Sequence, residues 1–151
     1  MLKLSRKTLF AIEAVLDIAY HGGSGPVQSA EITRRQGIPK RYLERALQEL
    51  VHAGLLIGVR GPRGGYRLAR ERRRIAIGEI VRVVRALEAA GAEIADAGGS
   101  ELGQKVVRPL WGELSATLAA RLESVTIEDM CARATAAGVA SEGRRNLDFA
   151  I

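Results

Sequence analysis

Apolar residues recur at helical spacing near the start of the chain. The segment 8–20 carries them at i, i+3, i+4 and i+7, namely at Ile12, Val15, Leu16 and Ala19. This spacing predicts an amphipathic helix, with Ser5 placed to cap its first turn. The next segment, 21–26, contains three glycines and a proline, so it predicts a turn that ends the helix.

Two more helices are predicted on either side of a glycine. The first is short, with Ser29 as its expected N-cap and Gly37 in the left-handed conformation that ends it. Pro39 fits the first turn of the second helix, which runs to about Ala53 and is closed by Gly54. The apolar positions of that helix share one face: Leu43, Ala46, Leu47 and Leu50. A short helix, a glycine turn and a second helix are the arrangement of a helix-turn-helix.

A β-hairpin is predicted directly after this unit. Residues 55–60 form a β-type run, residues 61–65 break it, and residues 66–69 form the returning strand. The tip carries Arg60 and Arg63 among glycines that let the backbone approach another surface closely. A nucleotide-binding phosphate loop is excluded because the tip lacks the Gly-Lys-Ser/Thr ending and joins two strands. A helix-turn-helix followed by such a hairpin is a winged helix.

The second half of the chain is predicted to be helical around one irregular stretch. A helix covers 77–88, a loop or frayed helix covers 89–103, and a short helix lies near 127–137. Between them a longer helix carries Pro109, which must sit in its first turn or kink it. That helix presents a stripe of large apolar residues: Val107, Leu110, Trp111, Leu114, Leu118, Leu122 and Val125.

This stripe needs a covering surface. Pairing with the same helix of a second chain would bury it and create two-fold symmetry. The residues assigned to this dimer contact are Leu110, Trp111, Leu114, Leu118 and Leu122. The alternative is that the stripe packs wholly on the first domain of its own chain.

Composition and cysteine usage narrow the class of protein. The chain has 151 residues, of which 47% are hydrophobic, so it can bury a core. Its apolar runs are far shorter than the roughly 18–20 residues of a membrane helix, and the N-terminus lacks a signal cleavage site. A cytoplasmic location without membrane contact is therefore expected. The single cysteine, Cys131, excludes an internal disulfide and a multi-thiolate metal cage within one chain.

Charge is distributed unevenly along the chain. Residues 1–75 hold 15 Lys and Arg against 6 Asp and Glu, a net charge of +9, whereas residues 76–151 hold 8 against 11. This asymmetry predicts that only the first half contacts a polyanion. No nucleophile–base pair, metal-ligand cluster or carboxylate dyad occurs at a meaningful spacing, so an enzyme is not expected.

Side chains suited to DNA gather on the predicted winged helix. The second helix of the motif reads base edges in the major groove. There Arg can donate two hydrogen bonds to guanine, Glu can accept a hydrogen bond from the cytosine amino group, and Tyr can contact a phosphate or a thymine methyl group. A helix N-terminus binds phosphate, and an arginine on the wing can enter a narrow minor groove. The candidate DNA-binding residues are Lys3, Arg6, Ser29, Lys40, Arg41, Tyr42, Glu44, Arg45, Arg60 and Arg63.

Roughly residues 1–130 resemble the IscR/NsrR-type family of bacterial transcription regulators. The resemblance is carried by Gly25–Val27, Ala30–Ile32, Gly37–Ile38, Tyr42–Glu44, Gly54–Leu55, Val59–Pro62, Gly64–Tyr66, Ile77–Ile80 and Leu110–Trp111. It implies a winged-helix domain, a long dimerisation helix and a near-palindromic operator bound by a homodimer. By position, Arg41, Tyr42, Glu44 and Arg45 match the family's base- and phosphate-contacting helix, and Arg60 matches its wing arginine.

One departure from the family concerns its iron–sulfur cluster. Many members hold the cluster with three cysteines in the loop before the long helix, but residues 89–108 contain no cysteine here. A histidine that is a fourth ligand in some members corresponds to Arg108. Thiolates hold such clusters, so no cofactor is expected. Cys131 is expected to be a small buried residue; the alternative is a redox switch, which requires exposure and a lowered pKa.

Together these patterns predict a mainly α protein with a two-stranded β wing and a long C-terminal dimerisation helix. The expected domains are a winged helix-turn-helix over 1–75, a linker helix, loop and dimerisation helix over 76–137, and a flexible tail over 138–151. The expected function is a sequence-specific transcriptional repressor that binds double-stranded DNA as a homodimer. A protein-interaction module with a partner enzyme is the alternative. A small-molecule effector would bind between the winged domain and the long helix, near 89–110.

Overall fold

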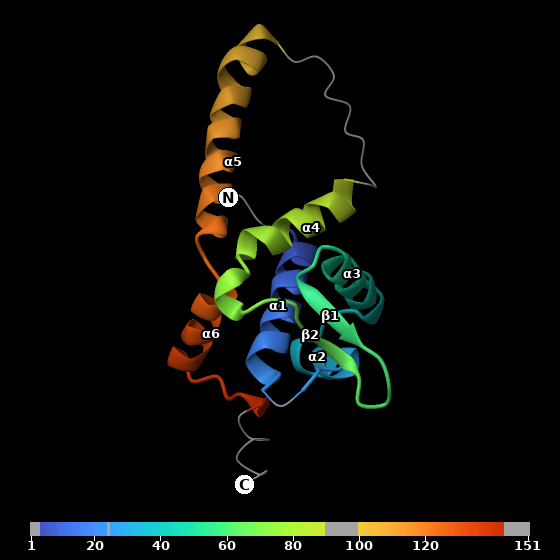
Figure 1. The fold of residues 1–151 in the computed structure, drawn as a ribbon. Helices are drawn as coiled ribbons and strands as arrows, with labels where there is room; N and C mark the ends of the chain where they lie inside the picture. The colour runs from blue at the N-terminus through green and yellow to red at the C-terminus, as the bar shows by residue number, and fades with distance from the viewer. Residues whose placement is uncertain (1–3, 24, 90–99, 144–151) are drawn as a thin grey trace.

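Helices make up most of the structure, a computed structural model that describes residues 4–23, 25–89 and 100–143 (Figure 1). The helices are α1 (Arg6–His21), α2 (Ser29–Gln36), α3 (Lys40–His52), α4 (Ile77–Ala89), α5 (Arg108–Glu123) and α6 (Ile127–Ala136). The strands are β1 (Leu56–Val59) and β2 (Gly65–Leu68), and two short turns are η1 (Arg72–Arg74) and η2 (Gly103–Val107). The predicted fold class, mainly helical with a two-stranded wing, is confirmed.

The first helix forms the centre of the fold. Ser5 caps α1 as predicted, because its side-chain oxygen accepts the Thr8 backbone N–H at 3.2 Å. The helix contacts α2, α3, α4, α6 and β2, and Figure 1 shows it running through the middle of these elements. Its apolar face is fully buried at Ala11, Ala14 and Val15. Helices α2, α3, α4 and α6 and strand β2 are therefore all positioned by direct contact with α1.

The start of α2 differs from the prediction by one residue. Gln28, not Ser29, is the N-cap: its backbone N–H donates to the Glu31 carboxylate at 3.0 Å, so Ser29 is the first helical residue. Val27 fixes this start, because its backbone exchanges two hydrogen bonds of 2.8 Å with Tyr66 of the wing. Glu31 then stands three residues after the cap, the spacing from which a carboxylate reaches back to the cap N–H.

The turn between α2 and α3 follows the prediction at its glycine. Gly37 adopts the left-handed conformation, with φ of 65°, and its N–H donates to the carbonyl of Thr33. Pro39 lies at the N-cap of α3 rather than inside its first turn. At either place its missing N–H leaves no intrahelical hydrogen bond unmade.

The wing is an antiparallel pair that depends on two glycines at its tip end. Leu56 pairs with Leu68, and Val59 pairs with Gly65 at the tip end. A Cβ on Gly64 would lie 2.1 Å from the Val59 carbonyl oxygen. A Cβ on Gly65 would lie 2.4 Å from the carbonyl oxygen of Val27, the residue before the α2 cap. The two glycines thus let the wing close tightly on itself and on the segment that leads into α2.

The long helix is continuous through its proline. Helical residues begin at Glu101, pass through the π-helical turn η2 and continue as α5, with Pro109 in the first turn of α5. A proline removes a backbone donor and crowds the preceding turn. The wider turn directly before Pro109 accommodates that defect, so the helix is not broken. Most of the loop predicted over 89–103 lies outside the described residues.

One hydrophobic core runs through the two predicted domains. Leu43, Leu47 and Leu50 of α3 are at most 1% exposed and share this core with Ile80 of α4 and Ile127 of α6. The expected boundary at residue 75 therefore separates elements that pack together, and α5 alone extends away from them (Figure 1).

Part of the C-terminal segment also packs against this body. A flexible tail is expected over 138–151, but the Ser141 hydroxyl donates to a carbonyl in the last turn of α1 at 2.6 Å. The backbone N–H of Glu142 donates to His21 Nδ1 at 3.0 Å. The end of a helix offers carbonyls without intrahelical donors, which gives this segment its partners. Residues 144–151 lie outside the described part of the chain.

Candidate nucleic-acid interface

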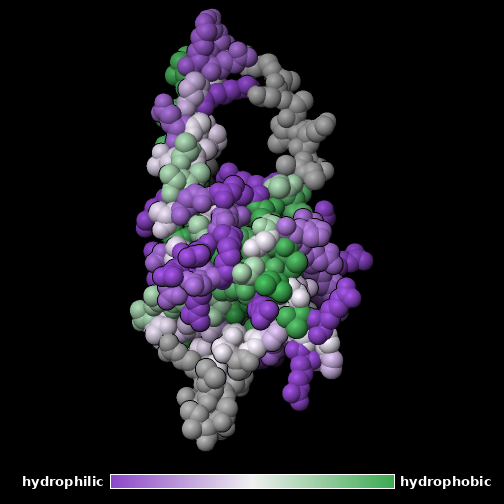
Figure 2. Space-filling view, in the orientation of Figure 1, coloured by the Kyte–Doolittle hydropathy of each residue, from purple (hydrophilic) through white to green (hydrophobic). Residues whose placement is uncertain are grey.

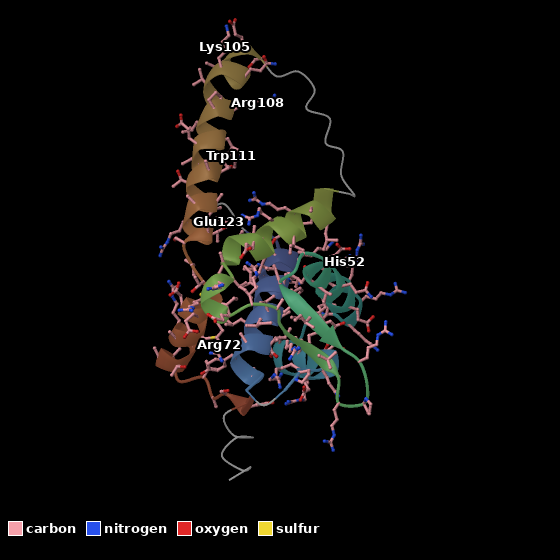
Figure 3. The ribbon with its side chains drawn as sticks, in the orientation of Figure 1. His52, Arg72, Lys105, Arg108, Trp111 and Glu123 are labelled. Carbon is pink, nitrogen blue, oxygen red and sulfur yellow. The ribbon has the colours of Figure 1, made fainter. Side chains whose placement is uncertain are left out.

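Helix α3 presents a polar face away from the core. Its inward face is the predicted set of Leu43, Ala46, Leu47 and Leu50, all buried. The residues exposed on the opposite side are Lys40, Arg41, Glu44, Arg45, Gln48 and His52, and Figure 3 shows His52 at the far end of this helix. Burial of one face thus leaves the predicted DNA-reading residues, apart from Tyr42, free to contact a ligand.

Tyr42 occupies an intermediate place between the core and this face. Its hydroxyl donates to the Lys7 carbonyl at 2.6 Å, and its ring lies 6.1 Å from the ring of Phe10. Burial, with a smaller effect of the nearby Glu88, raises the pKa of Tyr42 to about 12. The phenol is therefore neutral and ties α3 to the first turn of α1. A contact between Tyr42 and DNA stays a prediction.

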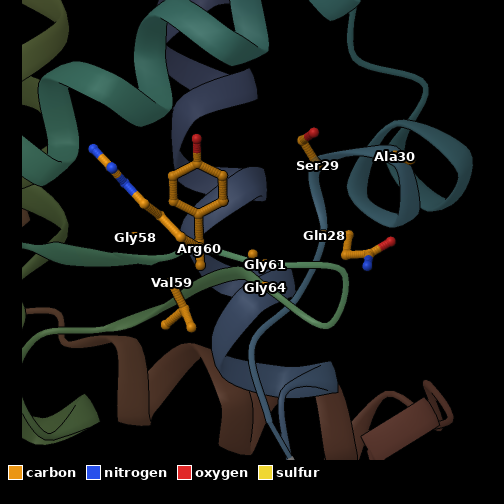
Figure 4. Close-up of a pocket in the computed structure, with 10 residues that line it drawn as sticks. Gln28, Ser29, Ala30, Gly58, Val59, Arg60, Gly61 and Gly64 are labelled. Atoms are coloured by element: carbon orange, nitrogen blue, oxygen red, sulfur yellow. The ribbon is translucent and has the colours of Figure 1, made fainter.

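A groove separates the start of α2 from the wing. It has a volume of about 470 Å³ and lies between the first residues of α2 and the glycine-rich strand ends (Figure 4). The Gln28 amide crosses it, donating to the Pro62 carbonyl at the wing tip at 3.2 Å. Ser29 and Arg60 both line the groove. An N-terminal helix turn and an arginine on opposite walls suit the phosphate backbone of a nucleic acid.

The remaining predicted cations lie around this face. Arg60 and Arg63 are exposed on the wing, and Arg6 is exposed at the start of α1. Lys3 lies outside the described residues. Figure 2 shows hydrophilic side chains projecting from the side of the molecule that carries α3 and the wing. The structure thus brings cations of three elements, α1, α3 and the wing, to exposed positions.

A buried charge cluster that sequence reasoning missed fixes α2 on α1. Asp17, whose side chain is 0% exposed, receives two hydrogen bonds from Arg35 at 2.8 and 2.9 Å and one from the Gln36 amide at 2.8 Å. Glu142 binds the same guanidinium at 2.6 Å. The hydrogen bonds that Arg35 donates to Asp17 raise the pKa of Arg35 further. The one sequence feature that could have indicated this cluster is Asp17 itself, a charged residue among the apolar residues of the first predicted helix.

The apolar stripe of α5 is uncovered over much of its length. Leu110 and Trp111 are 54% exposed and Leu114 is 45% exposed, whereas Leu118 and Leu122 are partly buried near the base of the helix. Figure 3 shows Trp111 midway along this projecting helix. The alternative that the stripe packs wholly on its own domain is therefore wrong. A cluster of large exposed apolar residues is typical of a protein-interaction site.

The match to a known family covers most of the chain. Residues 4–133 match the profile of Rrf2, described as an iron-dependent transcriptional regulator. The chain belongs to the Rrf2 family. It is therefore a transcriptional regulator of the DNA-binding, winged-helix type that the sequence predicts, and its relatives are regulators rather than enzymes.

Individual Rrf2 proteins are similar to this chain in sequence and in structure. The HTH-type transcriptional regulator IscR of Cronobacter sakazakii is 37% identical over 131 residues, which cover 85% of this chain and 80% of that protein. IscR of Aliivibrio salmonicida is 34% identical and covers 99% of this chain and 88% of its own. The solved structure of T. potens IscR has a TM-score of 0.74 at 36% identity and covers 93% of both chains. CymR, the global cysteine regulator of B. subtilis, has a TM-score of 0.69 at 29% identity, covering 88% of this chain and 98% of CymR.

The donor set of this Rrf2 chain does not fit an iron–sulfur cluster. Such clusters are held by several thiolates, and Cys131 is the only cysteine of the sequence. It lies on α6 within the hydrophobic core, 3% exposed. Burial raises the pKa of the Cys131 thiol, and the neighbouring Arg72 offsets this only in part. A buried thiol with a raised pKa is also a poor redox switch.

Two further predictions concern contact with a membrane and the binding of a small-molecule effector. Within the described ranges, none of the helices has the length and apolar character needed to cross a membrane. The effector pocket is expected near 89–110, and residues 90–99 of this range lie outside the described residues.

Proposed function

We propose that this Rrf2 protein is a homodimeric repressor that reads a near-palindromic operator without an iron–sulfur cluster. The observation that carries the proposal is the combination of a cationic outer face on α3 and an uncovered apolar stripe on α5. The first suits a DNA groove, and the second suits a second copy of the chain. Two copies related by a two-fold axis would present two recognition helices to two half-sites.

The role of each side chain on DNA follows from its chemistry. Arg41 and Arg45 supply guanidinium groups for guanine edges or phosphates, and Glu44 supplies an acceptor for a cytosine amino group. Arg60 enters the minor groove beside the site, while the start of α2 binds a phosphate across the 470 Å³ groove. Phosphate contacts supply affinity and base contacts supply sequence preference.

Dimerisation is supported by the position of the exposed stripe. Leu110, Trp111 and Leu114 lie on the part of α5 that projects from the body, away from α3 and the wing (Figure 1). A partner helix on this stripe would leave the DNA-facing residues of both chains uncovered. The proposed domain roles follow: residues 1–75 bind DNA, and α5 within 76–137 joins two chains.

The experiment selects operator sequences from random duplexes with the purified protein. We expect enriched duplexes to contain two inverted half-sites about one helical turn apart, and affinity to fall steeply with salt concentration. Arg41→Ala should weaken binding roughly tenfold or more and relax preference at one position in each half-site. Arg133→Ala, which removes an exposed charge on α6, is the matched control and should bind as the wild type does.

Three outcomes would contradict the proposal. Enrichment of a single unpaired half-site would exclude the dimeric arrangement. Full operator affinity and discrimination in Arg41→Ala would exclude the assigned face of α3. Stoichiometric iron with a visible cluster absorbance in anaerobically purified protein would contradict the cluster-free assignment.

A further inference from the structure

The base of α5 is fastened to the start of α4 by backbone hydrogen bonds. Ala76 and Thr126 form an isolated antiparallel bridge. On either side of it, the Ile77 N–H donates to the Val125 carbonyl at 2.8 Å, and the Ile127 N–H donates to the Ile75 carbonyl at 2.9 Å. The segments before α4 and after α5 therefore form one joint, while the other end of α5 projects from the body (Figure 1).

A side-chain contact lies beside this joint. Glu123, in the last turn of α5, forms an ion pair with Arg82 of α4. Its carboxylate lies so close to Gly78 that a Cβ there would come within 2.6 Å of Oε1. Figure 3 shows Glu123 at the base of α5. The missing side chain of Gly78 thus allows the carboxylate to lie over the first turn of α4, where the helix dipole favours negative charge.

We propose that the Gly78–Glu123–Arg82 contact sets the angle at which α5 leaves the DNA-binding body, and so determines which half-site spacing the dimer accepts. The inference rests on the proposed dimer. In that dimer the two recognition helices are separated by two bodies, two joints and the paired α5 helices. Any change of angle at the joint therefore changes the distance between the recognition helices.

Spacing is a sharp geometric requirement in DNA. One added base pair moves a half-site by about 3.4 Å and rotates it by about 35° around the duplex. A stiff joint cannot follow this displacement, whereas a loosened joint follows it in part. The contact therefore acts on spacing discrimination rather than on base recognition, because neither Glu123 nor Arg82 lies on the α3 face.

The first measurement compares operators whose central spacer is shortened or lengthened by one base pair. Gly78→Ala displaces the flexible Glu123 side chain, and Glu123→Gln removes its charge, so the two variants loosen the same contact in different ways. We expect the wild type to lose at least tenfold in affinity for the altered spacers. In both variants this penalty should shrink about three- to fivefold, in keeping with the modest strength of an exposed ion pair. Glu113→Gln, elsewhere on the exposed surface of α5, is the control and should retain the full penalty.

The second measurement needs no DNA. A spin label on Ala53→Cys, at the exposed end of α3, reports the distance between the two recognition helices of a dimer, and the buried Cys131 stays unlabelled. A narrow distance distribution in the otherwise wild-type protein should broaden in Gly78→Ala and in Glu123→Gln. The absence of any intermolecular distance would refute the dimer itself. A dimer whose distance distribution and spacer penalty are unchanged in both variants would overturn the inference alone.

Discussion

At the scale of single residues, the charges inside the fold are arranged in contacts that only folding creates. Asp17 lies within the apolar face of α1. Its carboxylate accepts hydrogen bonds from the Arg35 guanidinium and from the Gln36 side-chain amide. A buried charge is tolerated only when it is paired and hydrogen-bonded, so this set restricts where α2 can lie on α1. Glu142 adds a third carboxylate–guanidinium contact from the opposite end of the chain.

His21 makes this cluster sensitive to pH. Its Nδ1 accepts the Glu142 backbone N–H, and burial lowers the pKa of His21 below its ordinary value of 6.5, with Arg35 and Arg34 acting in the same direction against Asp17 and Glu142. A lowered pKa in the folded state means that the unfolded chain binds the proton more readily. The stabilising contribution is therefore complete above pH 6.5 and is lost as the pH falls below it.

We expect urea unfolding to show a modest loss of stability between pH 7.5 and pH 5.5 that depends on His21. His21→Gln keeps an acceptor without a titrating group, so part of this loss should disappear. His52→Gln, which alters the exposed histidine of α3, should retain the wild-type pH dependence. Identical pH profiles in wild type and His21→Gln would show that the histidine does not contribute.

At the scale of elements, local sequence signals specified most boundaries, and contacts between elements decided the rest. Ser5 and Gly37 act at helix ends as expected, and Thr126 caps α6 with its side chain accepting the Asp129 N–H. The N-cap of α2 lies at Gln28 rather than at the expected Ser29, because Val27 pairs with the wing. That pairing joins residues far apart in the sequence, so no local pattern at Ser29 could indicate it.

The wing provides the test at this scale. Arg60→Ala should weaken operator binding roughly tenfold and remove protection mainly at A·T-rich minor-groove positions, because a narrow minor groove attracts an inserted arginine. Arg67→Ala, which removes an exposed charge from β2, should have a much smaller effect. The measurement is affinity combined with a hydroxyl-radical footprint. An unchanged footprint in Arg60→Ala would place the wing outside the groove.

At the scale of the whole molecule, the body and the projecting helix have different roles. The body packs α1, α2, α3, α4 and α6 around one core, so the proposed recognition face on α3 is fixed to the other helices. Helix α5 contacts this body at its base through α4 and leaves its apolar stripe uncovered. In the proposed dimer, this exposed stripe is covered by the same helix of a second copy.

Leu114→Glu tests this arrangement directly. A charge at the centre of the proposed interface should convert the dimer to a monomer at micromolar concentration, and operator affinity should fall at least tenfold because half-sites are then bound independently. Since Leu114 is already 45% exposed, helix content should not change. Ala116→Glu, an exposed position on the other side of α5, is the matched control and should remain dimeric. Sedimentation velocity and circular dichroism provide the two measurements.

The sequence by itself determined the order of helices, the wing, the inward face of α3 and the family. These features depend on helical periodicity, capping residues and glycine positions, all of which act over a few neighbouring residues. The absence of a cluster-binding cysteine set is equally a property of the sequence. Cys131 matched its expected role as a small apolar residue, because one thiol on an amphipathic helix most often faces the core.

Only the tertiary structure decided how distant parts of the chain hold one another. It paired Asp17 with Arg35, brought Glu142 to both α1 and α2, and placed Glu123 over Gly78. It also showed that Tyr42 donates its hydroxyl to α1 and that the α5 stripe has no cover within the described chain. The physical reason is that a charge or an apolar surface has no preferred partner in the sequence; the partner is chosen by the packing that leaves the fewest buried polar groups unpaired.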